Sequence, residues 1–241
     1  MKTVTQPPHT RAPHGGTPPV DPRLPRHDPD GAVDRLLDAA EMLVAKQGLG
    51  VTDRAIVAAS GHRNNSAITY HFGNRQGLLD AVWQRRTARV ERRRAAFLLA
   101  AGTDLRQVDL RTAVTCYVTA FTDELASLTP SYWARFNERT LQERPLNFVD
   151  WVTVDLERFS GTVPLHSLLA LFGRMRELTG YGVEPVAGNR VALTVRFVIT
   201  TLAAWERDSE AGHSSWRNLD ELGSDLIEMA MSILDTPEKL S

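Results

Sequence analysis

Apolar residues recur every three or four positions in several stretches of the chain, whereas no stretch alternates apolar and polar residues over a useful length. The first helical stretch ends at Gly48 and is expected to begin near Asp28, which can cap a helix whose first turn contains Pro29. Its apolar positions are Val33, Leu36, Leu37, Ala40, Leu43 and Val44. The pattern predicts an all-α protein whose first element is an amphipathic helix.

Two short helices are expected next. Thr52 can cap the helix DRAIVAAS, which ends at Gly61, and residues 66–72 read as the following helix, which ends at Gly73. The turn between them, HRNN, is too polar and too rich in capping residues for a helix interior. Asn74 can then cap a long helix. Three helices with a tight polar turn between the second and third are typical of a helix-turn-helix.

Further helices are predicted towards the C-terminus, with breaks at prolines and glycines. Their expected ranges are 76–101, 110–128, 131–142, 148–159, 164–178, 185–208 and 219–234. The last two helices carry apolar stripes at helical spacing. These stripes are Val191, Val195, Val198 and Leu202 on the first, and Leu222, Leu226, Met229 and Ile233 on the second. Each stripe can face either a second copy of the chain or the core of its own domain.

Charge is distributed unevenly, although the net charge of the 241-residue chain is only −1. Residues 31–94 carry eleven Lys and Arg against six Asp and Glu, whereas residues 95–241 carry thirteen against twenty. This asymmetry is typical of a small module that binds a polyanion, joined to a larger acidic domain. One arginine cluster, interleaved with Glu91, is expected to form a solvated helix face. Its members are Arg85, Arg86, Arg89, Arg92, Arg93 and Arg94.

Residues 1–30 differ in composition from the rest of the chain. They contain eight of the 13 prolines and few large apolar side chains, so they are predicted to be a disordered Pro-rich arm. The arm can be an inert tail. Alternatively, its arginines Arg11, Arg23 and Arg26 can touch nucleic acid.

Other features narrow the class of protein. Cys116 is the only cysteine, which rules out an intrachain disulfide, and its apolar surroundings predict a small buried hydrophobe. No run approaches the roughly 20 apolar residues that span a bilayer, and the N-terminus lacks the apolar segment of a signal peptide. No HExxH pair, zinc spacing, Walker or Rossmann pattern occurs. We therefore expect a soluble cytoplasmic protein with no membrane association, metal or cofactor.

The helix at residues 66–72 has two different sides. Ile68 and Phe72 lie on one face and can pack on the first helix, while hydroxyl and amide side chains lie on flanks that this core does not cover. A recognition helix needs this arrangement, with donors and acceptors directed at base edges and basic groups beside them for phosphates. In the alternative interpretation, Tyr70 and His71 are ordinary half-buried packing residues.

At these residues the chain resembles the TetR family of bacterial transcriptional regulators, over about residues 33–82. The motifs that carry the resemblance are AAEMLVAKQG, IVAASG and YHFGNRQGLL, in that order, and the last is the most specific. The resemblance implies a DNA-binding homodimer. It also implies that the C-terminal helical domain binds a small molecule and releases the DNA, so that the protein acts as a repressor at a palindromic operator.

The family's DNA-contacting positions carry over to specific residues of this chain. They are Arg54, Asn65, Ser66, Ala67, Thr69, Tyr70, His71 and Arg75. Arg54 can form a bidentate bond to guanine, Asn65 can pair with adenine, and Thr69 can meet a thymine methyl group. Tyr70, His71 and Arg75 are expected to anchor phosphates. Asp53 is interpreted as structural, since an acid there repels phosphate unless it caps helix amides.

The resemblance also implies a division of labour along the chain. Residues 31–78 are expected to form the DNA-binding domain and residues 79–238 the effector-binding and dimerisation domain, with the last two long helices pairing in the dimer. An apolar cavity among the middle helices suits a hydrophobic or aromatic effector. Its expected lining residues are Tyr117, Phe121, Trp133, Phe136, Trp151 and Phe172. Aromatic residues on helices can equally be core.

Two other functions compete with the regulator. The chain can be an all-helical enzyme, although it carries no recognisable catalytic or metal motif. It can also be a helical interaction module without DNA binding. The polar side chains kept together between Asn65 and Arg75 argue against the interaction module.

Overall fold

The computed structural model describes residues 31–64, 66–100, 107–146, 148–149, 166–179, 186–213, 216 and 218–235. In these ranges the regular structure is entirely helical, which confirms the all-α prediction. The helices are α1 (Ala32–Gln47), α2 (Asp53–Ala59), α3 (Ala67–Phe72), α4 (Arg75–Ala100), α5 (Leu110–Ala126), α6 (Trp133–Gln142), α8 (His166–Leu178), α9 (Val186–Glu210) and α10 (Leu219–Leu234). The predicted disordered arm and most of the helix predicted at 148–159 lie outside the described residues.

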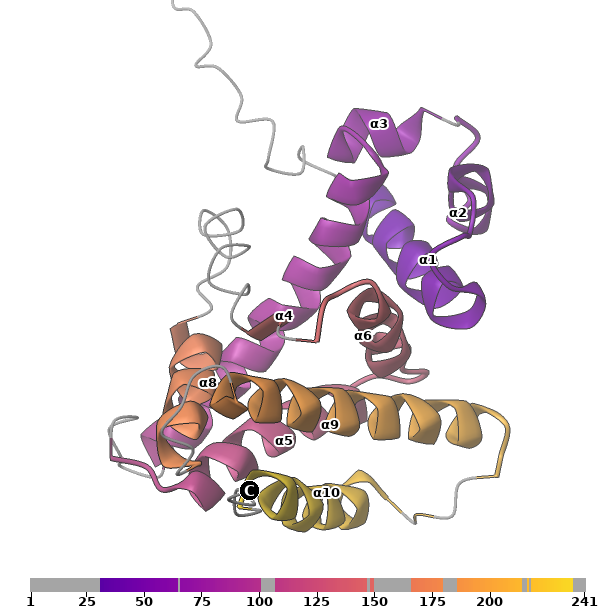
Figure 1. Ribbon diagram of the computed structural model, residues 1–241. Coiled ribbons are helices and arrows are strands. Elements are labelled where there is room, and N and C mark those ends of the chain that lie inside the picture. The colour runs from indigo at the N-terminus through magenta and orange to yellow at the C-terminus, as the bar shows by residue number, and fades with distance from the viewer. Residues whose placement is uncertain are drawn as a thin grey trace, which may run out of the picture.

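The helices form a small head and a larger body (Figure 1). Helices α1, α2 and α3 make up the head, and α4 runs from the head into the body, where it packs on α5 and α8. Helix α6 lies between α1 and α9, and α10 packs on α5 and α9. The head therefore contacts the body mainly through α4 and α6.

Local capping signals set the ends of the head helices. Gly48 and Gly73 adopt φ angles of 85° and 78°, a left-handed conformation in which glycine ends a helix without strain. The Thr52 side chain accepts a hydrogen bond from the amide of Ala55 at 3.2 Å, and that of Asn74 accepts one from the amide of Gly77 at 2.8 Å. These four predictions are confirmed, because each depends on a few neighbouring residues only.

The start of α1 differs from the prediction. The helix begins at Ala32, after Gly31 at a φ angle of 65°, and not near Asp28. A left-handed glycine interrupts helical geometry, so the capping pair predicted from the sequence is too early in the chain. Asp28 and Pro29 themselves lie outside the described residues.

One continuous hydrophobic core joins the head to the body. Leu36, Ile56, Ile68 and Leu78 are fully buried in or beside the head, and Phe72 packs against the same cluster. Cys116 is buried as expected, and burial raises the pKa of its thiol to about 11.

The apolar stripe predicted on the penultimate helix faces the core of its own domain. Val191, Val195, Val198 and Leu202 are all buried within the single chain. Of the stripe on α10, Leu222 and Leu226 are buried as well, whereas Met229 is 50% exposed and Ile233 is partly exposed. Most residues of the two stripes therefore face the core of their own domain and not a second copy of the chain.

The expectation that the arginine cluster of α4 is a solvated face is wrong. Arg86 and Arg94 are only 9% and 3% exposed, and Arg85 is largely covered. Only Arg89 and Arg92 remain exposed. The reason is tertiary, because α4 packs between α1, α5 and α8, which leaves little of its surface for solvent.

Carboxylates from neighbouring helices neutralise Arg85, Arg86 and Arg93, whereas Arg94 pairs with Glu91 of α4 itself. Glu41 of α1, 2% exposed, accepts hydrogen bonds from Arg86 Nε at 2.9 and 3.0 Å and from Arg85 Nη2 at 3.1 Å. Glu124 of α5 accepts one from Arg93 Nε at 3.2 Å and lies 3.7 Å from Arg86 Nη1. A buried charge must be paired. The cluster therefore ties the head to the body through α4.

Candidate DNA-binding surface and effector cavity

Helix α3 presents a polar face to solvent and an apolar face to the core. Ser66 and Thr69 are exposed, and Tyr70 is 59% exposed, so most of the Tyr70 side chain faces solvent. Ala67 differs from the expectation, because it is 6% exposed and belongs to the core together with Ile68. Ala67 lies beside Ile68 on the side of α3 that packs on the core.

His71 lies at the border of this face. It is partly buried, and its ring meets that of Tyr70 edge to face at 4.8 Å between centroids. It also lies 6.5 Å from the ring of His62, which follows α2. Asn65, the other base-reading candidate, lies outside the described residues.

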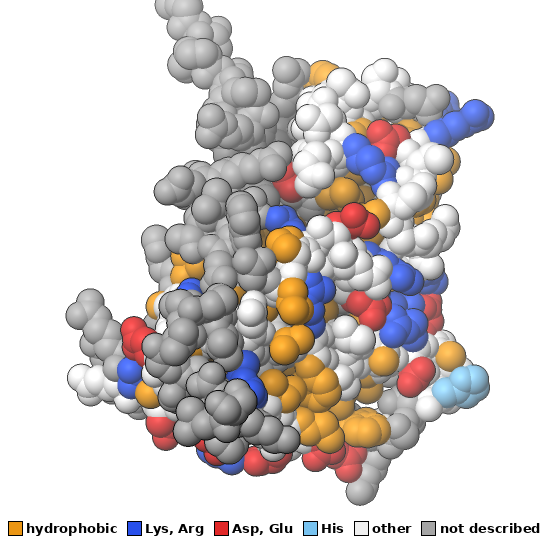
Figure 2. All heavy atoms as spheres, in the orientation of Figure 1, with side chains coloured by type: hydrophobic (Ala, Val, Ile, Leu, Met, Phe, Trp, Pro, Cys, Tyr) orange, Lys and Arg blue, Asp and Glu red, His pale blue; other side chains and the backbone are white. Residues whose placement is uncertain are grey.

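Helix α2 adds basic groups beside α3. Arg54, in the first turn of α2, is exposed, as is Arg63 in the turn that leads to α3. Figure 2 shows Lys and Arg side chains projecting over this end of the head. The structure thus brings exposed hydroxyl, phenol and guanidinium groups to one end of the molecule.

Arg75 links three elements of the head. Its Nη1 atom lies 2.6 Å from Asp53 Oδ1 on α2, and its Nη2 atom donates to the carbonyl of Leu49 at 2.8 Å. The side chains of Arg75 and Asp53 are still 28% and 47% exposed. Asp53 therefore pairs with Arg75 inside the head and holds the Arg75 side chain at the start of α4.

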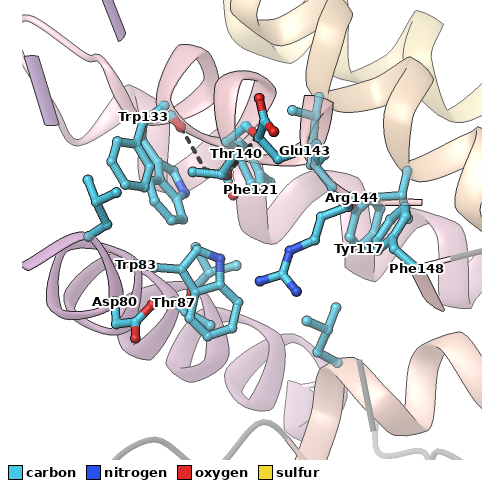
Figure 3. A pocket seen from close by; sticks show the side chains of 18 of the residues that line it. Asp80, Trp83, Thr87, Tyr117, Phe121, Trp133, Thr140, Glu143, Arg144 and Phe148 are labelled. Atoms are coloured by element: carbon cyan, nitrogen blue, oxygen red, sulfur yellow. Dashed lines mark hydrogen bonds between the residues drawn. The ribbon is translucent and has the colours of Figure 1, made fainter. Parts of the chain in front are cut away.

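A cavity of about 470 Å³ lies between α4, α5, α6, α8 and α9 (Figure 3). The residues expected to surround an effector mostly line it. These are Tyr117, Phe121, Trp133, Phe136 and Phe172. The sixth, Trp151, lies outside the described residues. A cavity of this size holds one small organic molecule.

Rings pack against one another in the buried part of the wall. Trp133 is nearly parallel to Phe121 and to Phe136, with ring centroids 6.1 and 5.8 Å apart. Tyr117 meets Phe172 at 5.8 Å between centroids, and burial raises the pKa of the Tyr117 hydroxyl far above its ordinary value. This part of the cavity wall is mainly aromatic.

Polar side chains stand at the exposed part of the wall. Gln76, Glu143 and Arg144 are exposed, and Figure 3 shows the Arg144 side chain reaching into the cavity. Gln76 donates to Asp80 at 2.8 Å between Nε2 and Oδ1. The cavity therefore changes from apolar at its buried part to polar at its exposed part.

Helix α4 also contributes to this wall, although the sequence did not lead us to expect it there. The wall residues of α4 recur three or four positions apart: Leu79, Trp83, Thr87, Val90 and Arg94. That spacing is the available signal, since it places them on one helix face. Because Thr87 and Arg94 are polar, this face resembles an ordinary solvent-exposed helix face in the sequence.

The cavity also touches the head. Leu49, in the loop after α1, and Gln76, in the first turn of α4, both line it. Nearby, Glu210 of α9 lies 2.6 Å from Lys46 of α1 and 2.7 Å from Arg135 of α6. Head, cavity and body therefore meet at one junction.

Helix α6, which forms one side of the cavity, is fixed at its N-terminal end by a carboxylate from α9. Glu206 accepts hydrogen bonds from the amides of Ala134 and Arg135 at 3.1 and 2.9 Å, and from the hydroxyl of Ser131. An anion at a helix N-terminus is favourable. Burial nevertheless raises the pKa of Glu206.

The described residues contain no group of three or more His, Cys, Asp or Glu placed to hold a metal ion. None of their helices is both long and apolar enough to cross a membrane.

No protein-family model and no curated protein matches the sequence. Several solved structures, among them two regulators, match most of its length. A TetR-like transcriptional regulator from Rhodococcus sp. RHA1 is 16% identical, with a TM-score of 0.50 over 88% of this chain and 100% of that one. The fatty acid degradation regulator FadR from Bacillus halodurans is 15% identical, with a TM-score of 0.51 over 85% and 99%. The chain therefore has the fold of TetR-like transcriptional regulators.

Proposed function

We propose that the protein is a sequence-specific DNA-binding transcriptional regulator. The observation that carries the proposal is the exposed polar face of α3, with Tyr70 projecting to solvent beside the basic end of α2, on a fold shared with TetR-like regulators. In this proposal residues 31–78 bind DNA and residues 79–238 bind the effector and dimerise. An intracellular location in the cytoplasm follows, because the target is DNA.

Regulation is proposed to be repression that a small apolar or aromatic effector relieves. Two heads of a homodimer enter successive major grooves about 34 to 36 Å apart on a palindromic operator. The effector fills the cavity at the junction and shifts α4, which changes the spacing of the heads. The contact of the cavity with Leu49 and Gln76 supports this route, because an occupant touches head and body together.

The dimer surface is proposed to include the outer sides of α9 and α10. The α9 stripe named from the sequence is buried in its own domain, so other residues must form the surface. Leu193 of α9 and Met229 of α10 are 45% and 50% exposed, and Phe197 is partly exposed. Figure 2 shows apolar side chains gathered along α9. Exposed apolar patches of this kind mark interfaces.

Selection of bound duplexes from a random DNA pool tests the proposal, followed by a salt titration on the recovered motif. We expect a palindromic motif, and an affinity whose logarithm falls linearly with the logarithm of salt concentration. A folded dimer that enriches no motif, with and without extracts containing small molecules, contradicts it.

Thr69→Ala and Tyr70→Ala are expected to act differently on the recovered operator. Thr69→Ala removes a methyl and hydroxyl group directed at a base, so it should relax the preference at one position of each half-site. Tyr70→Ala removes a phosphate anchor, so it should weaken all sequences by a similar factor. Competition binding against single-base operator variants measures both. An equal loss across all operators for Thr69→Ala refutes its base-reading role.

Asp53→Asn is expected to strengthen DNA binding. The change removes a negative charge from the proposed surface and frees Arg75, now 2.6 Å from Asp53, to meet a phosphate. The salt dependence should become steeper by about one unit of slope per head. Fluorescence anisotropy over a range of salt concentrations measures it, with Asp123→Asn on the exposed side of α5 as control. A weaker affinity with unchanged slope shows instead that Arg75 needs Asp53 for its position.

A further inference from the structure

The indole of Trp133 has a buried hydrogen-bond donor without an acceptor. Trp133 is 2% exposed, and its Nε1 atom has no hydrogen-bond partner among the residues that the structure describes. A buried donor left unpaired costs free energy comparable to a lost hydrogen bond, so nearly all such groups in native proteins are paired. No residue that the structure describes supplies the missing acceptor.

The position of Trp133 in the cavity wall indicates a source for that acceptor. The residue lines the cavity, opposite Trp83 in Figure 3. Its ring is held nearly parallel to Phe121 on one helix and Phe136 on its own. Because these rings restrict its rotation, the indole stays in the wall of the cavity.

A second buried donor lies in the same wall. Arg94 is 3% exposed, and within the described part of the chain its Nε atom has no hydrogen-bond partner. Its Nη1 atom is paired with Glu91 at 2.5 Å, and its guanidinium lies 5.7 Å from the ring centre of Tyr117. The charge of Arg94 is thus neutralised, while one N–H remains to be satisfied. An occupant that meets Arg94 therefore needs a hydrogen-bond acceptor and not a negative charge.

The charges of the wall disfavour a charged occupant. Among the described residues that line the cavity, Arg94 and Arg144 are opposed by Asp80 and Glu143, and Glu91 pairs with Arg94 just behind the wall. No positive excess is left for an anion. Desolvating a carboxylate beside the apolar rings is costly without such an excess.

We propose that the effector is an uncharged, mainly apolar molecule whose carbonyl oxygen accepts a hydrogen bond from Trp133 Nε1. Its apolar part lies against the rings of Phe121 and Phe136, and the volume of about 470 Å³ sets its size. This inference rests on the proposed function, since it takes the cavity as the effector site.

Three naphthalene probes of nearly equal shape test the inference. 2-Acetylnaphthalene carries the carbonyl, 2-isopropenylnaphthalene replaces its oxygen with a methylene group, and 2-naphthoate carries a negative charge. Isothermal titration calorimetry of the purified full chain gives the affinity of each. The ketone is expected to bind more tightly than the carboxylate. Tighter binding of 2-naphthoate overturns the claim that the occupant is uncharged.

The variant Trp133→Phe isolates the hydrogen bond. It keeps an aromatic ring between Phe121 and Phe136 but removes the N–H, so the affinity ratio of ketone to alkene is expected to fall about fivefold from that of the unchanged protein. Using the ratio cancels the loss of ring area, which affects both probes. Trp83→Phe, in the same wall, is the matched control and should leave the ratio unchanged. An unchanged ratio in Trp133→Phe, or an equal fall in both variants, overturns the assignment to Trp133.

The design separates this inference from the proposed function. Operator binding is measured in parallel by anisotropy, without any probe. If no probe binds while the operator is recognised, the assignment of the cavity fails and the DNA-binding regulator stands. If the ratio falls as expected while the protein recognises no DNA, the acceptor site stands and the proposed function fails. Thermal unfolding of Trp133→Phe checks that the variant is folded, and the comparison of probes on the unchanged chain does not depend on it.

Discussion

Replacement of Glu41 by glutamine is expected to lower the free energy of unfolding by about 1 to 3 kcal/mol. Glu41 is the buried acceptor for Arg86 Nε and Arg85 Nη2, and both guanidinium groups are largely covered by protein. Glutamine has nearly the same shape, so the packing of α1 on α4 is kept. The loss therefore reports mainly on Arg86, whose remaining carboxylate, Glu124, lies 3.7 Å away, because Arg85 keeps Asp38 at 2.7 Å. Urea denaturation followed by circular dichroism measures it.

Glu228→Gln is the matched control for this prediction. Glu228 forms a close pair with Arg111, but both side chains are more than half exposed. Solvent-exposed pairs contribute little to stability. We expect the midpoint of denaturation to stay within experimental error. A similar loss in the two variants contradicts the view that burial of the Glu41 cluster decides the outcome.

Arg54→Ala is expected to cause the largest loss of operator affinity among single changes on the head. An exposed arginine at the start of α2 can make a bidentate bond to a guanine, and each such pair contributes about 1 to 3 kcal/mol of discrimination. A homodimer carries the change twice, once per half-site. Anisotropy on the recovered operator and on a scrambled duplex measures the loss.

The pattern of loss distinguishes two roles for Arg54. A base contact predicts that binding to the operator falls far more than binding to the scrambled duplex. A phosphate contact predicts the same factor for both duplexes and a shallower salt slope. Arg111→Ala, on α5 in the body, removes an exposed arginine away from the head and should change neither. No loss on either duplex excludes Arg54 from the interface.

Helix α4 contacts both the cavity and the DNA-binding head, and it uses a different side for each. One side forms cavity wall through residues such as Trp83 and Val90. Another side carries Arg85 and Arg86, which hold Glu41 of the head. In the proposed regulator, a ligand that moves α4 therefore also moves the ionic contacts to α1. Coupling between sites requires such an element with two arrangements that both sites influence.

Sequence alone determined the elements whose signals are local. Glycines at positions 48 and 73, and the caps Thr52 and Asn74, end or begin helices through hydrogen bonds and backbone angles that involve only a few neighbouring residues. Apolar spacing at three and four residues likewise reveals a helix without any partner. These signals were sufficient for the all-α class and for the helix-turn-helix arrangement.

Tertiary packing decided which side of each helix is covered. Arg86 and Arg94 read as solvent-facing from composition, yet they are buried because α4 packs against α1, α5 and α8. On the short helix α3, Ala67 lies in the core whereas Tyr70 is exposed to solvent. The apolar stripe of α9 faces the core of its own domain. Helical periodicity identifies a face but not its neighbour, since burial depends on contacts between residues far apart in the chain. The cavity arises from the same contacts, because no single helix encloses it.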